Sequence, residues 1–190
     1  MATGAVHTRA SMVLALPTGA AAWIGYDWWV GVRSVPVAAG AMLGCLTGIF
    51  LTPDLDIEAV TGSEWTIIKW TLGLGWLWVL FWWPYAWVFH HRSIWSHLPI
   101  LSTVIRLLYV ALVFSLWWWV LSVLVAAVTF MFGNGSYWLP EVNPASMWAF
   151  CMENFEWAFG LFFGLAVSDF AHWLMDAAPL RGMKTVGNEL

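Results

Sequence analysis

Apolar stretches with few polar residues follow one another along most of the chain. A run of about 18 or more apolar residues predicts a membrane-spanning helix, because about 20 residues cross the core of a bilayer. We expect four full spans, at residues 12–32, 35–51, 107–132 and 146–176. The predicted fold class is therefore all-α, a polytopic membrane helical bundle in which residues 1–190 form a single membrane domain.

One further apolar stretch, residues 65–89, is interrupted by Lys69, Gly73, Gly75 and Pro84. Because such residues tolerate bends, we expect a re-entrant or interfacial segment here rather than a full span. The path of this segment matters for function. A single crossing would place the acidic motif before it and the histidine-rich motif after it on opposite faces, whereas zero or two crossings unite them.

Small residues recur at helical spacing inside two of the expected spans. Gly40, Gly44 and Gly48 are four residues apart, and Gly160 and Gly164 repeat that spacing near the end of the chain. A stripe of missing side chains lets another helix approach closely. We interpret both stripes as packing faces.

Composition narrows the class of protein. The chain is 62% hydrophobic and 9% charged, with a mean hydropathy of +0.76. Its net charge of −4 gives no basic patch, so no nucleic-acid partner is expected. Membrane lipid is the expected surrounding, and many of the 18 Trp residues are expected to anchor at its interfaces. The two cysteines form no C-x-x-C pair, so the sequence supports neither a disulfide framework nor a cysteine-rich metal site.

The few ionisable residues gather in clusters at the ends of the apolar stretches. Ionisable groups near a bilayer are costly unless they face a cavity, pair with one another or bind an ion. Histidine with aspartate is the ligand set of hydrolytic Zn and Mn sites. The predicted metal ligands are His7, Asp54, Asp56, His91, His172 and Asp176.

The last cluster has helical spacing. Asp169, His172 and Asp176 are three and seven residues apart, which places them on one face of a helix over two turns. His172 and Asp176 can reach one metal ion, or Asp176 can orient the imidazole; Asp169 is a further ligand or outer neighbour. An internally satisfied polar pair inside a bundle is the alternative interpretation.

The acidic cluster is the Pro-Asp-Leu-Asp motif at residues 53–56. Asp54 and Asp56 would repel each other, and each would favour protonation unless a cation lies between them. A solvated loop or the N-cap of a following helix is the alternative.

The histidine-rich cluster spans residues 90–97. His91 and His97 flank Arg92, and histidine serves both as a metal ligand and as a general base near neutral pH. Arg92 suits bidentate binding of a phosphate oxygen, whereas an arginine that only reaches to the interface is the alternative. We predict Arg92 and His97 as catalytic residues.

The order of these motifs is informative as a set: an N-terminal His, then P-D-L-D, then H-R-S-I-W-S-H at 91–97, then His172 with Asp176. This order resembles the YdjM-type family of membrane-bound metal-dependent hydrolases. It is more similar still to the related uncharacterised metal-binding membrane proteins of bacteria and archaea, which share the H-R-S-x-x-S-H form. The resemblance covers most of the chain and implies a metal site at these positions with hydrolase activity.

The expected function is a divalent-metal site at the cytoplasmic interface, with Zn as the first choice and Mn or Fe as alternatives. The expected reaction is hydrolysis of a phosphoester, on a phosphorylated or lipid substrate. A non-catalytic, metal-stabilised subunit of a larger membrane complex is the second hypothesis, and a metal transporter is the third. The positively charged residues place the site face and both termini on the cytoplasmic side of a bacterial or archaeal membrane. Those on the site face are Arg9, Lys69, Arg92, Arg106, Arg181 and Lys184.

Overall fold

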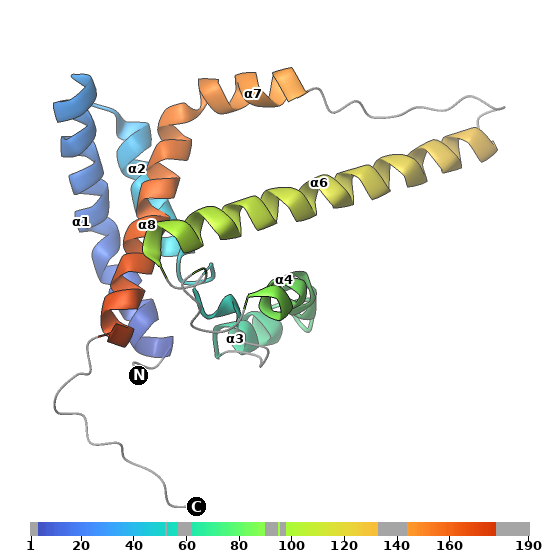
Figure 1. Ribbon diagram of the computed structural model, residues 1–190, viewed down its shortest axis with the longest axis horizontal. Coiled ribbons are helices and arrows are strands. Elements are labelled where there is room, and N and C mark those ends of the chain that lie inside the picture. The colour runs from blue at the N-terminus through green and yellow to red at the C-terminus, as the bar shows by residue number, and fades with distance from the viewer. Residues whose placement is uncertain are drawn as a thin grey trace, which may run out of the picture.

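The computed structural model describes residues 4–51, 53–56, 62–89, 95, 98–132 and 144–177. Within these ranges every regular element is a helix (Figure 1). In chain order they are α1 (Gly4–Val30), α2 (Val35–Thr47), the short 3-10 helix η1 (Pro53–Asp56), α3 (Gly62–Trp70), α4 (Trp76–Val88), α6 (Pro99–Phe132), α7 (Pro144–Glu153) and α8 (Phe155–Ala177). The predicted all-helical class is confirmed.

Three helices, α1, α2 and α8, pack side by side along most of their length (Figure 1). α1 buries one narrow stripe whose members recur every three or four residues, which is the repeat of a single helix face. The stripe consists of His7, Ser11, Ala15, Thr18, Ala22 and Tyr26. It is polar toward the N-terminus of α1, so the interior of the bundle changes character along its axis.

Glycines set the distance between α2 and α8. A Cβ atom on Gly40 would lie 2.8 Å from the carbonyl oxygen of Trp157, and one on Gly44 or Gly164 would overlap the backbone of the facing helix. The two backbones therefore touch, as small-residue faces allow. The predicted packing role of both glycine stripes is confirmed.

The end of the bundle where α1 leads into α2 is closed by hydrogen bonds to one carboxylate. Ser34 is the N-cap of α2, because its Oγ accepts a hydrogen bond from the backbone N–H of Val37 at 3.2 Å. The same hydroxyl donates to Glu156 of α8 at 2.7 Å, and the hydroxyl of Tyr26 in α1 donates to Glu156 at 3.5 Å. One carboxylate thus joins three helices.

Residues 65–89, expected to be irregular, fall within a short helical hairpin of α3 and α4. The turn between them places Leu72 at φ 52° and Gly73 at φ 94°, and Thr71 accepts a hydrogen bond from the backbone of Gly75 at 2.7 Å. The glycines thus mark the turn, as predicted, but Pro84 lies inside α4 and does not end it. Each helix is too short to cross a bilayer core alone.

An aromatic cluster joins this hairpin to α6. Trp82 and Tyr85 of α4 are each 1% exposed and stack or pack edge-on against Tyr109 of α6. Leu55, which lies between the two aspartates of the acidic motif, is buried in the same cluster. The cluster therefore holds η1 in place, and with it Asp54.

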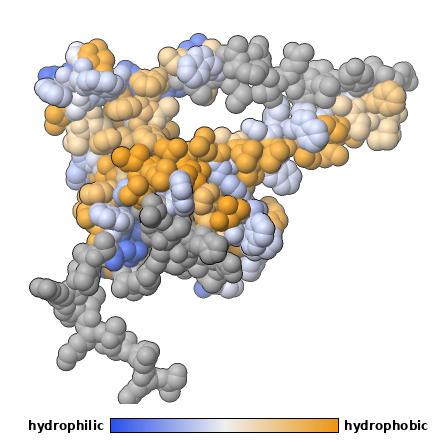
Figure 2. All heavy atoms as spheres, in the orientation of Figure 1, coloured by the Kyte–Doolittle hydropathy of each residue, from blue (hydrophilic) through white to orange (hydrophobic). Residues whose placement is uncertain are grey.

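α6 is a continuous helix of 34 residues that lies across α8 (Figure 1). The helix begins at Pro99, eight residues before the span predicted from residue 107, so Arg106 lies inside it and is buried against α8. Beyond about residue 111 the helix leaves the bundle, and nearly all its apolar side chains are exposed. Figure 2 shows hydrophobic residues along its visible surface and over the adjoining face of the bundle.

Other boundaries also differ from expectation. The single helix expected at 146–176 is two helices, separated at Asn154, and His7 lies within α1 rather than before it. Among the described residues, two helical segments, Pro99–Phe132 and Phe155–Asp176, are long and apolar enough to cross a membrane; α2 is apolar but has only 13 residues. The four-span arrangement stays a prediction.

Candidate metal centre

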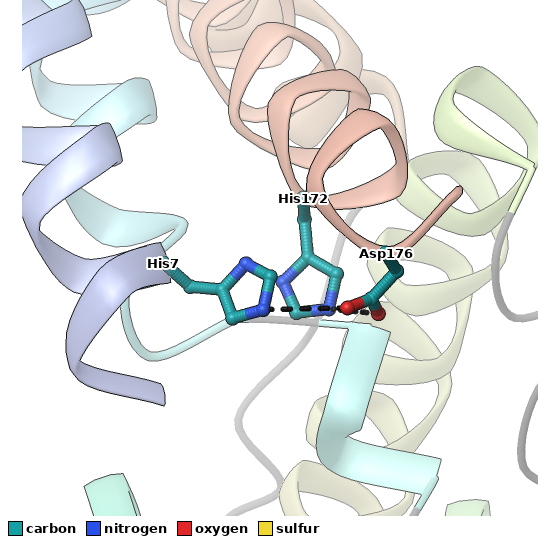
Figure 3. A group of neighbouring side chains, drawn as sticks. All are labelled: His7, His172 and Asp176. Atoms are coloured by element: carbon teal, nitrogen blue, oxygen red, sulfur yellow. Dashed lines mark ion pairs between the residues drawn. The ribbon is translucent and has the colours of Figure 1, made fainter. Parts of the chain in front are cut away.

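Three separate parts of the chain meet at the end of the bundle that holds the start of α1 and the end of α8. His7 comes from the second turn of α1, and His172 and Asp176 come from the last two turns of α8 (Figure 3). Asp54 comes from η1, just after α2. α1 runs away from this end, α2 returns to it and α8 returns again, so residues about 170 apart in sequence become neighbours.

The two imidazole rings stack, with centroids 3.8 Å apart and planes 17° from parallel. His7 Nε2 lies 3.6 Å from Asp176 Oδ1, and His172 Nε2 lies 3.4 Å from Asp176 Oδ2. Figure 3 shows both rings pointing their Nε2 atoms toward this one carboxylate. Asp54 Oδ1 lies 3.4 Å from His172 Nε2. Two imidazoles thus meet at the carboxylate of Asp176, and a second carboxylate, that of Asp54, contacts one of them.

Burial differs across the cluster. The imidazoles are almost fully buried, with 7% of His7 and 4% of His172 exposed. The carboxylates are more accessible, at 19% side-chain exposure for Asp176 and 28% for Asp54. The nitrogen side of the cluster is therefore walled by the bundle, and the carboxylate side offers the approach.

The donor set fits a borderline or hard divalent cation. One ligand atom from each of His7, His172 and Asp176 can be chosen so that all three lie within 4.8 Å of one another. Around a tetrahedral ion with bonds of about 2.0–2.1 Å, neighbouring ligand atoms lie about 3.3 Å apart, close to the 3.4–3.6 Å separations found here. Imidazole with carboxylate suits Zn, Mn or Fe. A cation here would also offset the charge of two facing carboxylates.

A second polar layer lies one turn farther into the bundle. Ser11 follows His7 by one turn of α1, and Ser168 precedes His172 by one turn of α8; their hydroxyl oxygens are 2.9 Å apart. Next to them, the thiol of Cys45 in α2 donates to the backbone oxygen of Ser11 at 3.4 Å. Two successive layers of polar contacts therefore connect α1 to α8. One is the stack of His7 on His172, and the other is the hydrogen bond between Ser11 and Ser168.

The structure brings four of the six predicted ligands together: His7, Asp54, His172 and Asp176. The backbone of Asp56 lies in η1, but its side chain is outside the described residues. His91, Arg92 and His97 also lie outside them, so the predicted catalytic residues stay predictions.

Asp169 does not join the cluster, although it was predicted as a further ligand or outer neighbour. Its side chain forms an ion pair with Arg106 of α6 and accepts a hydrogen bond from Thr103 of the same helix. From the sequence, Arg106 is predicted only as one of the positive charges on the site face. The signal that would have found the pair is an arginine and an aspartate each isolated within an apolar helix, since such charges usually pair with one another.

The model of a family described as "Uncharacterized metal-binding protein (DUF2227)" matches residues 2–184, a range that includes all four clustered side chains. No curated protein and no solved structure matches the chain.

Proposed function

Because this chain belongs to that family of uncharacterised metal-binding proteins, we propose that its function depends on a divalent metal ion held by His7, His172, Asp176 and Asp54. The observation that carries the proposal is the convergence of two stacked imidazoles on the two oxygens of Asp176. Zn is the expected ion, with Mn and Fe as alternatives for the same donor set.

We propose a membrane location for the site. Two helices meet the length and hydropathy of a span, and beyond the bundle the exposed surface of α6 is apolar apart from Ser115 and Thr129. At about 1.5 Å per residue α6 is about 51 Å long, against a hydrocarbon core of about 30 Å, so it lies tilted or extends into the headgroup layer. We propose that the site end faces the cytoplasm of a bacterium or archaeon, and the excess of Arg and Lys predicted for that end supports this orientation.

The proposed reaction is hydrolysis of a phosphoester, with a phosphorylated molecule or a lipid as substrate. A bound divalent ion lowers the pKa of a coordinated water and polarises a phosphoryl oxygen. The chain supplies the rest: the bundle keeps the imidazole side closed to water, and the more exposed carboxylate side gives access. Arg92, predicted to bind the substrate anion, belongs to the motif that follows α4.

The second candidate is a non-catalytic, metal-stabilised subunit of a larger membrane complex. The observation that favours it is the outer half of α6, where Trp117 and Trp119 are 65% and 66% exposed. Two results together would support this candidate over the hydrolase. The wild-type protein would copurify with a defined set of membrane proteins, and it would show no metal-dependent turnover of phosphoester substrates.

The deciding experiment is elemental analysis of the detergent-purified protein beside a His172→Ala, Asp176→Ala double variant. We expect stoichiometric Zn, Mn or Fe in the wild type and its loss in the variant. Glu156→Gln, which changes a carboxylate at the other end of α8, is the matched control and should keep its metal. A folded wild-type protein that takes up no metal even after reloading would refute the proposal and leave the cluster as a set of polar packing contacts.

A further inference from the structure

A second charged pair is buried one turn along α8 from the metal centre. Arg106 of α6 is 3% exposed and Asp169 of α8 is 1% exposed. The Asp169 oxygen that accepts from the Arg106 guanidinium also accepts from the hydroxyl of Thr103, which is 1% exposed. Two side chains of α6 therefore donate hydrogen bonds to one carboxylate of α8.

Stability alone is a poor explanation for this pair. Removing two charges from water costs several kcal/mol per ion, and apolar replacements of similar volume are often equally stable. Buried ion pairs are best attested where they fix the register of one helix against another. We therefore ask which part of the molecule depends on a fixed rotation of α8.

Asp169 lies on α8 close to the two metal ligands of that helix. Asp169 precedes His172 by three residues and Asp176 by seven, so it points within about 20° of the Asp176 direction, about 10.5 Å farther along the axis. Ser168, beside it, is bonded to Ser11 of α1. The turn of α8 next to the metal ligands is thus anchored on two sides, to α1 by Ser168 and to α6 by Asp169.

A small rotation of α8 is enough to disturb the centre. A side-chain atom about 5.5 Å from a helix axis moves by roughly 1 Å when the helix turns by about 10°. Metal–ligand distances tolerate changes of only about 0.2 Å. An anchor that fixes the rotation of α8 therefore controls whether His172 and Asp176 can reach the same ion as His7.

We propose that Arg106 and Thr103 are positioning residues of the metal centre, which act through Asp169 to set the rotation of α8. The proposal rests on the proposed function, since it concerns the same ligands. The proposal links α6, a helix with many exposed apolar side chains, to the metal site, because a displacement of α6 would move His172 through Asp169.

The test replaces the pair without leaving a buried charge, in an Arg106→Met, Asp169→Leu variant of the full chain. We measure the affinity for Zn²⁺ by competition with a chelating dye, the visible absorption spectrum of the Co²⁺-loaded protein, and the thermal unfolding of the metal-free protein. We expect metal affinity to fall by about 10-fold to 100-fold, as for lost outer neighbours of metal ligands. The Co²⁺ spectrum should shift, while the metal-free protein unfolds near the wild-type temperature.

Two further variants separate positioning from general damage. Arg106→Lys keeps a charged donor and should retain an affinity between those of the wild type and the pair variant. Thr103→Val keeps the volume and removes only the hydroxyl; it should alter the Co²⁺ spectrum, and it carries the test if the pair variant does not fold. Glu156→Gln, a change to the other polar anchor of α8, should leave both readouts unchanged.

The outcomes are distinct. Wild-type affinity and an unchanged Co²⁺ spectrum in the pair variant, or in Thr103→Val if the pair does not fold, would overturn the positioning role while the metal centre stands. A wild-type protein that binds neither Zn²⁺ nor Co²⁺ would overturn the proposed function itself. Equal losses of affinity in Glu156→Gln and in the pair variant would also overturn the positioning role, because they would indicate a general loosening of α8.

Discussion

The two ends of the α1–α2–α8 bundle solve the same packing problem with different chemistry. At one end Glu156 joins the three helices by accepting hydrogen bonds from Ser34 and Tyr26. At the other end His7 and His172 stack against each other and face Asp176. Both ends bring a carboxylate of α8 between neighbouring helices, but only the second surrounds it with nitrogen ligands.

This difference separates what is needed to fold from what is available for binding. Two hydroxyl donors suffice to hold one carboxylate where three helices meet, so joining helices does not require imidazole. The site end adds a second carboxylate, Asp54, held in place by the aromatic cluster around Leu55. The site end therefore has more nitrogen and oxygen donor atoms than are needed to join the helices, and a metal centre requires such additional donors.

The largest effect should come from a substitution that separates α2 from α8 and so disrupts both ends of the bundle. Gly164→Leu would drive a side chain into the backbone of Ala41, and steric overlap in a packed core costs about 1–3 kcal/mol or more. We expect loss of the folded bundle, measured by thermal unfolding and size-exclusion chromatography in detergent. Gly25→Leu, at a position with open space around the absent Cβ, is the control. A Gly164 variant as stable as this control would show that the helices can separate without cost.

Metal removal should weaken the site end alone. Binding to the folded state stabilises it by about 2.7 kcal/mol when the free ion is at 100 times Kd. We expect a chelator to lower the unfolding temperature of the wild type and of Glu156→Gln. The temperature for His172→Ala should not respond, since its metal is already lost. The same chelator-induced decrease in His172→Ala would place the ion elsewhere.

A smaller effect is expected at the edge of the site. Asp54→Asn keeps the shape of a side chain that is 28% exposed but removes its charge. We expect about a tenfold weaker affinity for Zn²⁺, measured by chelator competition, because His7, His172 and Asp176 remain. Complete loss of binding would instead make Asp54 a principal ligand, and no change would exclude it from the centre.

The smallest effect belongs to the end without nitrogen ligands. Ser34→Ala removes the N-cap of α2 and one hydrogen bond to Glu156, which costs about 1 kcal/mol. We expect a slightly lower unfolding temperature and unchanged metal content by elemental analysis. A coupled loss of metal would mean that the two ends are not independent.

The sequence was a good guide to which residues meet at the site end. The clusters lie at the ends of apolar stretches, and helices that run to and fro bring such ends together, so the closeness of His7, Asp54 and His172 follows from topology. The packing role of the glycine stripes was equally predictable, because glycines four residues apart lie on one face of a helix and let another helix approach closely.

Partners across long sequence distances were harder to predict. Helical spacing puts Asp169 on the same face as Asp176, but the two lie about two turns apart along the axis, too far to share one ion. Periodicity identifies the face of a residue and not the helix opposite. That Arg106 of α6 lies there depends on how α6 crosses α8, and nothing local in the sequence fixes that crossing.

The spread of the ligands along the chain sets an order of events during synthesis. His7 is made 169 residues before Asp176 (176 − 7), which at about 5–20 residues per second is a delay of roughly 8–34 s. α2 is complete 129 residues before Asp176 (176 − 47), and until α8 is made the faces of α1 and α2 that contact it stay uncovered. We therefore expect a metal ion to bind only after α8 has been made, whereas a chain that stops short of α8 would expose the glycine stripe of α2.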